Sequence, residues 1–223
     1  MKKVLVCLVV GICVFGMANL ALAIPAGVTN LLQNSSFETY TNLGSGLVDW
    51  DNWTEGGEWY LDNRFTDGSH SARLGVDTGY LYQTFALTSG DTLYFGANFK
   101  LITNEFAGNW DQTQINMQVA GLPDTTIGGD VNGAFGDLTW TFVGGTTYES
   151  NWFLVAGEVD ISGLNLPANA AININLQNYD SANTRLVVDS AYAGTAAAPV
   201  PEPSTFLLLG GGLIGLICYR RKR

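Results

Sequence analysis

Strict alternation of apolar and polar residues is the feature that most constrains the fold of this 223-residue chain. In the segments 93–101, 115–119, 138–142 and 172–176, apolar residues occupy every second position. Successive side chains of a strand point to opposite faces, so the pattern predicts strands buried on one face and solvated on the other. Two antiparallel sheets that pack through their apolar faces would bury all of these strands together.

Shorter apolar runs, separated by turns rich in Gly, Asn and Asp, predict further strands. These lie at residues 31–33, 57–62, 71–76, 79–87, 151–161 and 184–192. Outside the two ends, no segment of ten or more residues shows a helical period. The sequence therefore predicts one all-β domain over residues 24–194, an antiparallel β-sandwich, followed by a short linker at 195–199.

Charged residues are scarce in this domain, and most of them are acidic. Six of the ten basic residues of the chain lie at its extreme ends. Between residues 24 and 199, only Arg64, Arg73, Lys100 and Arg185 stand against nineteen acids. Phosphate backbones require clustered Lys and Arg, so this composition excludes a nucleic-acid partner.

The N-terminus has the order of a secretory signal peptide. Lys2 and Lys3 precede the apolar run 4–17, and Ala21-Leu22-Ala23 forms a small-residue cleavage site. We expect residues 1–23 to be removed on export. The alternative is an uncleaved N-terminal membrane helix.

The C-terminus carries a second targeting pattern. Val200-Pro201-Glu202-Pro203-Ser204-Thr205 is followed by the apolar run 206–219 and four terminal basic residues. Fourteen helical residues span about 21 Å, which is short for a hydrocarbon core of about 30 Å. The basic end would stay cytoplasmic, which leaves the domain outside the membrane.

This order of motif, short helix and basic terminus resembles the PEP-CTERM sorting signal of exported bacterial proteins. The resemblance covers about the last 24 residues, with Pro201, Glu202 and Pro203 as the sorting motif. It implies recognition by an exosortase, transient residence in the inner membrane through a transmembrane helix at 206–219, and removal of the tail. It also implies a Gram-negative-type bacterium that makes exopolysaccharide, with this protein at its cell surface or in the extracellular matrix. The alternative is a plain C-terminal anchor.

Residues for catalysis are sparse. Cys7, Cys13 and Cys218 all lie in the terminal segments, so the mature domain would hold no thiol, Cys-zinc site or disulfide. His70 is the single histidine, and no Gly-x-Ser-x-Gly segment offers a nucleophile to pair with it. No pair of carboxylates is marked for glycoside hydrolysis. We therefore expect a protein without enzymatic activity.

A second resemblance covers residues 31–192. The segments concerned are Asn34-Ser35-Ser36-Phe37-Glu38, Trp50, Trp53, residues 68–74, 82–85 and 89–95, and Leu186-Val187-Val188-Asp189. In this order they resemble galactose-binding-like jelly rolls, a group that includes carbohydrate-binding modules. The resemblance implies a jelly-roll sandwich and a structural calcium ion held by Glu38 and Asp189. The last segment departs from the pattern, because Val188 and Ser190 stand where Asp and Val are usual.

Aromatic residues suggest where a glycan would bind. Trp50, Trp53, Trp59, Tyr60 and Trp110 fall in or beside predicted loops, and exposed rings of this kind stack on sugars. The segment 50–60 also holds acids that the few bases cannot pair, which predicts that part of it, with one indole, is exposed. The alternative is that the cluster from Trp50 to Tyr60 closes one end of the sandwich. Trp140 and Trp152 lie in apolar strands, and we expect both in the core.

Three functions remain open from the sequence. The first is an exported, non-catalytic glycan-binding module associated with exopolysaccharide in a biofilm-type matrix. The second is a structural matrix or surface protein with no specific ligand. The third is a secreted polysaccharide hydrolase.

Overall fold

The computed structural model describes residues 27–75, 77–87, 92–104, 113–122, 125–131, 138–177 and 184–196. The predicted signal peptide, the sorting motif with its apolar run 206–219, and Trp110 lie outside these ranges. Within them, no helix has the length and apolar character needed to cross a bilayer.

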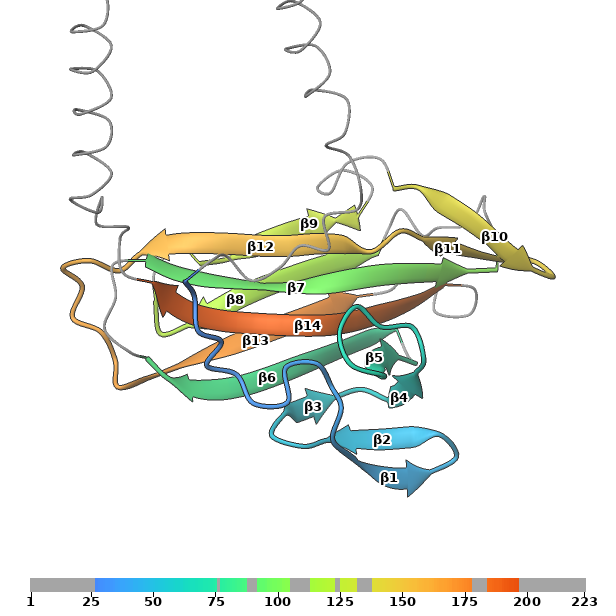
Figure 1. The fold of residues 1–223 in the computed structure, drawn as a ribbon, viewed down its shortest axis with the longest axis horizontal. Coiled ribbons are helices and arrows are strands. Elements are labelled where there is room, and N and C mark those ends of the chain that lie inside the picture. Colours follow the sequence, from blue (N-terminus) through green and yellow to red (C-terminus); the bar gives the residue numbers. More distant parts are fainter. Residues whose placement is uncertain are drawn as a thin grey trace, which may run out of the picture.

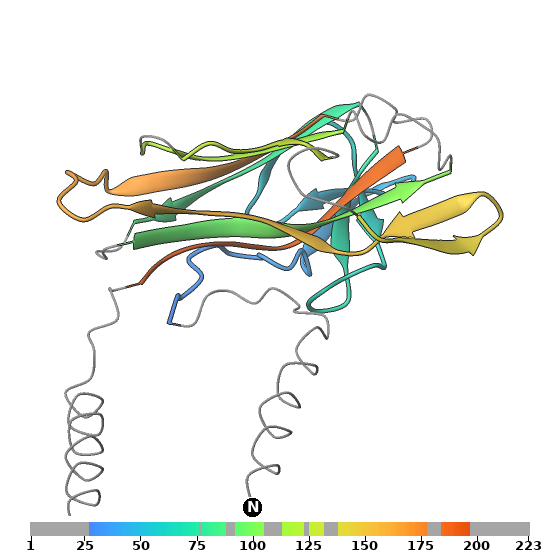
Figure 2. The same cartoon turned by 90° about the horizontal axis from the view of Figure 1, so that it is seen from above.

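Within the described ranges, fourteen strands form two antiparallel sheets that face one another across the core, the jelly-roll β-sandwich that the sequence predicts (Figures 1 and 2). In spatial order the larger sheet contains β1 (Tyr40–Gly44), β2 (Leu47–Trp50), β4 (Trp59–Asp62), β5 (Ser71–Leu74), β14 (Thr184–Ala196), β7 (Thr92–Thr103), β11 (Thr147–Ser150) and β10 (Trp140–Gly144), with β12 (Phe153–Asp160) also paired to β7. The smaller sheet contains β3 (Thr54–Gly56), β6 (Thr78–Ala86), β13 (Asn169–Gln177), β8 (Gln114–Ala120) and β9 (Ile127–Asp130).

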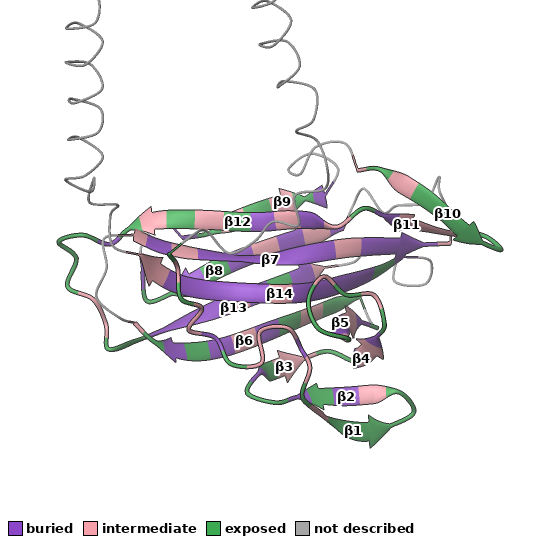
Figure 3. Ribbon diagram, in the orientation of Figure 1, coloured by how far each residue is buried: buried purple, intermediate pink, exposed green. Residues whose placement is uncertain are grey.

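The core lies between the inner faces of β7, β14, β6, β13 and β8. On β7, Leu93, Ala97 and Phe99 are fully buried, and on β8 Ile115 and Met117 are fully buried. The intervening residues of β8 point away from the core, as the alternation predicts. Figure 3 shows this concentration of buried residues in the central strands, with exposure increasing toward both ends of the larger sheet.

Several strand predictions need correction. Residues 31–33 are not a strand; the Leu31 amide donates to Ala193 O of β14, so this segment lies against the larger sheet as irregular backbone. The sequence did not predict β1, β2, β3, β9 and β11, each of which has at most five residues. At the other end, β14 continues to Ala196, two residues into the predicted linker.

The strand near residue 140 is correctly predicted, but its predicted burial is wrong. Trp140 is only partly buried, and Phe142 is 57% exposed. Both belong to β10, one of the two terminal strands of the larger sheet, which extends past the sandwich in a hairpin with β11 (Figure 2). Trp152, also expected in the core, is partly buried and lies beneath the Lys100 ammonium at 5.8 Å from its ring.

Three of the four basic residues of the domain form ion pairs on the larger sheet. Arg64, just after β4, contacts Asp62 Oδ1 at 3.0 Å and also pairs with Glu149 of β11. Lys100 of β7 contacts the other oxygen of Glu149 at 2.8 Å, and Arg73 of β5 contacts Asp62 at 3.2 Å. The network ties the loop after β4 to strands on both sides of β14.

Candidate functional site

The outer face of the smaller sheet carries three aligned rows of carboxamide side chains. The strand register places Asn173 opposite Gln118, Asn175 opposite Asn116, and Gln177 opposite Gln114. The same register continues to β6 and places Tyr82 beside Asn173, Tyr80 beside Asn175 and Thr78 beside Gln177. Directly opposed side chains in an antiparallel pair lie about 5 Å apart, so each row is a continuous polar strip across three strands.

No charged residue occupies an outward position on these three strands. The outward residues are Thr78, Tyr80, Tyr82, Thr84 and Ala86 on β6, Gln114, Asn116, Gln118 and Ala120 on β8, and Asn169, Ala171, Asn173, Asn175 and Gln177 on β13. The domain has nearly five acids for each base, so three adjacent strands without an outward charge stand out; the exposed Asp130 of β9, opposite Gln114, lies at the edge of this face. Its chemistry is that of amides, hydroxyls and two phenol rings.

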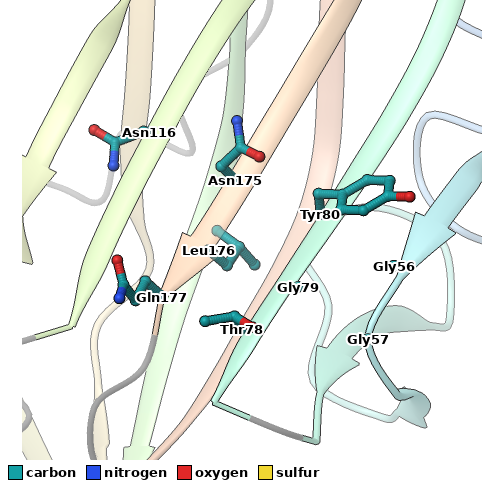
Figure 4. A pocket seen from close by; sticks show the side chains of 9 residues that line it. All are labelled: Gly56, Gly57, Thr78, Gly79, Tyr80, Asn116, Asn175, Leu176 and Gln177. Carbon is teal, nitrogen blue, oxygen red and sulfur yellow. The ribbon is translucent and has the colours of Figure 1, made fainter.

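Tyr80 forms one wall of a pocket at this face. Its ring is 42% exposed and lies across the backbone of Gly56, where an added Cβ would come within 2.1 Å of Tyr80 Cε1. The pocket has a volume of about 360 Å³ and is lined by the rows of Asn175 and Gln177 (Figure 4). Glycine at position 56 therefore allows the aromatic ring to lie flat at the edge of the amide rows.

The next row along the strands contains Tyr82 and Asn173, and Thr84 follows on β6. Thr84 Oγ1 lies 3.4 Å from Tyr82 Oη, so these side chains share the same side of β6. Asn173 Oδ1 is buried and accepts no hydrogen bond from the described residues. Among the described residues of this face, Asn173 Oδ1 is therefore a buried acceptor without a hydrogen-bond donor.

The aromatic cluster predicted as a glycan site is mostly core. Trp50 and Trp59 are 1% exposed and Trp53 is 6% exposed, so the prediction of an exposed indole among them is wrong. Phe37 packs edge-on against Trp50 at 5.5 Å between centroids and stacks on Trp53 at 5.2 Å. These rings close the end of the sandwich beside the β1–β2 hairpin.

The polar residues of the same segment explain why the prediction failed. Asp51, Asn52 and Glu58 are exposed, while the indoles between them point inward. Asn52 has a positive φ of 69°, so a tight turn separates Trp50 from Trp53 and lets both face the core. The carboxylates reach solvent from this segment without any indole leaving the core.

The other two predicted aromatics do not join an exposed platform. Tyr60 is partly buried on the larger sheet, with the Arg73 guanidinium 4.9 Å from its ring centroid and its hydroxyl 3.2 Å from Glu58 Oε2. Trp110 lies outside the described residues.

Glu38, one predicted calcium ligand, is already fully engaged by donors. Its Oε1 accepts the backbone amides of Ser69 and His70 at 2.6 and 2.7 Å. Its Oε2 accepts the Ser69 hydroxyl at 2.7 Å and lies 3.2 Å from His70 Nδ1. Desolvation raises the pKa of Glu38, but these hydrogen bonds outweigh it and lower the pKa to about 2.

Asp189, the other predicted ligand, is fully buried and holds the same loop at a second point. Its Oδ2 accepts the amide and hydroxyl of Thr66 and the amide of Asp67, and its Oδ1 accepts the Ser190 amide. Burial raises the pKa of this carboxyl despite the hydrogen bonds.

A shared calcium ion does not fit these two carboxylates as they are arranged. Calcium needs six to eight oxygen ligands, whereas N–H and O–H donors occupy the oxygens of both side chains. In the described ranges, no three His, Cys, Asp or Glu residues come together in a way that could hold a metal ion. The loop 64–70 is held by carboxylates that accept its backbone amides.

Glu55 is a further carboxyl whose pKa is shifted from its ordinary value. It lies on β3 beside a pocket of about 460 Å³ that Asp49 and Glu58 also line. Desolvation raises the pKa of Glu55 to about 7, against the opposing effect of the hydrogen bond that its Oε1 accepts from the Trp50 amide. Its proton equilibrium therefore falls near neutral pH.

Comparison with known proteins identifies the C-terminal signal. Residues 199–222 match the PEP-CTERM protein-sorting motif, which confirms the resemblance drawn from the sequence. The motif indicates export and exosortase-dependent sorting toward the cell surface of Gram-negative-type bacteria. A search of curated proteins found no match.

Solved structures similar to this chain include binding modules and enzymes. The carbohydrate-binding module TmCBM61, solved with beta-1,4-galactotriose, is 12% identical with a TM-score of 0.46, covering 75% of this chain and 99% of the other. A cyclase from Fischerella sp. TAU is 11% identical with a TM-score of 0.46, covering 77% of this chain and 99% of the other. The cellulose-specific module CBM28 is 12% identical with a TM-score of 0.40, covering 74% and 95%.

Proposed function

We propose that this protein is exported, processed by an exosortase, and retained at the cell surface or in an exopolysaccharide matrix, where its sandwich binds a neutral polysaccharide without catalysis. The binding site of this proposal is the outer face of the smaller sheet. The observation that carries it is the set of three carboxamide rows flanked by Tyr80 and Tyr82, on strands with no outward charge.

The chemistry of the face matches that of sugar hydroxyls. A carboxamide offers both a donor and an acceptor, and each sugar hydroxyl can take either role. A phenol ring provides an apolar surface for the C–H face of a sugar ring, as Tyr80 does beside the pocket. Three rows spaced by two residues cover about 14 Å along the strands and about 10 Å across them, which suits a stretch of polymer.

The lack of outward charge on β6, β8 and β13 favours a neutral ligand and argues against hydrolysis on these three strands. An acidic polysaccharide would gain nothing from side chains that carry no positive charge. Glycoside hydrolysis requires two carboxyl groups flanking the bond, and no outward residue of β6, β8 or β13 is an acid. The described residues of this face have the chemistry of a binding surface.

A binding series on the full-length protein tests this proposal. We expect affinity for neutral polysaccharides to fall about tenfold or more in Tyr80→Ala and in Asn175→Ala, with the melting temperature nearly unchanged. Gly56→Ala should weaken binding without touching a ligand-facing side chain, because the added Cβ displaces the Tyr80 ring. Phe65→Ala, which removes an aromatic ring that is 46% exposed and lies outside the smaller sheet, is the matched control.

The outcomes separate the three candidate functions. Unchanged affinity in both Tyr80→Ala and Asn175→Ala would reject this face as the site. A protein that binds no polysaccharide would support the structural matrix role, which the burial of Trp50, Trp53 and Trp59 already favours. Release of reducing sugar ends from a polysaccharide would instead support the hydrolase.

A further inference from the structure

The two ends of the larger sheet are built in the same way. β1 and β2 form a hairpin in which Tyr40 pairs with Trp50 and Gly44 with Leu47. β10 and β11 form a hairpin of the same lengths, in which Trp140 pairs with Ser150 and Gly144 with Thr147. β1 and β10 are the terminal strands of the sheet and lie at opposite sides of the molecule (Figure 1).

These two terminal strands lack the charge that marks the other free edges. Among the described residues, the strands with an unpaired edge are β1, β10, β3, β9 and β12. β3 contains Glu55, β9 contains Asp130, and β12 contains Glu158 and Asp160. β1 and β10 contain neither a charged residue nor a proline. Proteins commonly place such residues on edge strands to block pairing with another chain, so these two edges are open to it.

Exposed apolar side chains concentrate on the same strands. Leu43 on β1 is 62% exposed, and Phe142 and Val143 on β10 are 57% and 51% exposed. These are the three most exposed large hydrophobic residues in the described ranges. Figure 3 shows both strands as mainly exposed, in contrast to the buried central strands of the sheet. Pairing with another strand would remove part of this apolar surface from water.

The strand directions of the sheet make these two edges complementary. Every neighbouring pair from β1 to β10 is antiparallel, and the path contains eight strands. The twist of the sheet turns the terminal strands relative to one another, so β1 and β10 both run toward the right in Figure 1. A second copy that is rotated so that this twist continues would place its β1 antiparallel to β10 of the first copy, and both strands have five residues.

We propose that copies of this protein associate head to tail through β10 of one copy and β1 of the next, so that the larger sheet continues from molecule to molecule. The domain carries far more acids than bases, so two copies repel across most of their surfaces. The uncharged terminal strands are where they approach at least electrostatic cost. Because the contact joins two different edges, each added copy leaves one free β1 and one free β10, and repetition with the rotation that continues the sheet twist produces a helical filament. This proposal does not depend on glycan binding at the outer face of the smaller sheet.

Single lysine substitutions on each edge provide the test. Leu43→Lys places a charge on β1 and Phe142→Lys places one on β10, both at exposed positions that leave the core intact. Leu164→Lys is the matched control, because Leu164 is 40% exposed in the connection between β12 and β13. Mass is measured by light scattering on the full-length chain in detergent, at increasing protein concentration. All variants carry the same terminal apolar segments, so any association through those segments is common to them.

The proposal predicts that the wild type and Leu164→Lys form oligomers that grow with concentration and with added salt, because salt screens the repulsion. Each edge variant alone should stay at a smaller, constant mass. An equal mixture of Leu43→Lys and Phe142→Lys should form a species of twice that mass and no larger. The unchanged β10 of Leu43→Lys pairs with the unchanged β1 of Phe142→Lys, and the other two edges of that pair carry the lysines. No growth of the wild type, or continued dimerisation of either edge variant alone, would overturn it.

A second pair of variants tests the same edges in case Leu43→Lys or Phe142→Lys fails to fold. Thr41→Lys on β1 and Thr141→Lys on β10 change residues that lie opposite Asp49 and Glu149 in their own hairpins. A lysine at position 41 gains Asp49 as a cross-strand partner, whereas Glu149 is already paired with Arg64 and Lys100; both positions are exposed, so either lysine places charge on the edge without changing the core. The same pattern of single and mixed masses is expected, and association that neither pair reduces would reject the edge contact.

Discussion

Replacement of Trp53 distinguishes a core aromatic cluster from a binding surface. The Trp53 indole is 6% exposed, stacks on Phe37, and donates from Nε1 to Asn34 O at 3.1 Å. Trp53→Ala removes all three contributions and leaves a cavity at the end of the sandwich. Substitutions of this type cost about 3–5 kcal/mol of unfolding free energy. For a domain of this size, that corresponds to a fall in melting temperature of about 6–20 °C.

Circular dichroism through a thermal ramp measures this change on the full-length protein. Trp53→Phe is the graded control, because it keeps an aromatic ring against Phe37 and loses the indole hydrogen bond, worth about 1 kcal/mol. Polysaccharide affinity, measured well below both transitions, should be close to that of the wild type. A melting temperature within about 2 °C of the wild type, together with lost affinity, would refute the assignment of Trp53 to the core and restore it as a ligand-binding residue.

Four further outcomes follow from the structure and the terminal segments. The pKa of Glu55 is raised from 4.5 to about 7, so the native state loses stability as the pH rises through this range; Glu55→Gln should therefore be more stable than the wild type at pH 8 but not at pH 4, in chemical denaturation. The pKa of Glu38 is lowered from 4.5 to about 2, so its contribution is present above pH 4.5 and lost as the pH falls toward 2; Glu38→Gln should lower the melting temperature at pH 7 and have little effect near pH 2. Because donors occupy Glu38 and Asp189, excess chelator should leave the melting curve unchanged, and a lower melting temperature would establish a bound cation. Mass spectrometry of the surface protein should show loss of residues 1–23 and 206–223, and peptides containing Cys218 would contradict this processing.

From the sequence, the outer face of the smaller sheet could be predicted only as a set of polar positions on separate strands. Gln114, Asn116 and Gln118, and likewise Asn173, Asn175 and Gln177, occupy the outward positions that the alternation predicts. The pattern does not show that these two strands are neighbours, because pairing depends on which segments far apart in the chain meet. The register of β8 on β13 aligns the amides into rows, and β6 adds the two tyrosines.

The aromatic segment failed as a prediction for a related reason. Trp50 lies an odd number of residues from both Trp53 and Trp59, so a strand period of two does not assign all three to one face. The turn at Asn52, with its positive φ, directs both neighbouring indoles inward, and Phe37 from a distant segment completes their packing. Glu38 and Asp189 were expected to share a cation, yet the loop 64–70 folds between β4 and β5 so that its backbone amides reach both carboxylates.

The sequence by itself determined the features that are local in the chain. The C-terminal sorting signal is a short linear segment, and strand alternation follows from backbone geometry with a period of two, so neither depends on distant contacts. Which strands became neighbours, which lay at the edges, and which of the aromatic and polar residues met were decided by the tertiary structure. Those outcomes depend on pairing between segments separated by up to about 160 residues, as between Asn30 and Ala191, where burial and hydrogen bonding are shared by both partners.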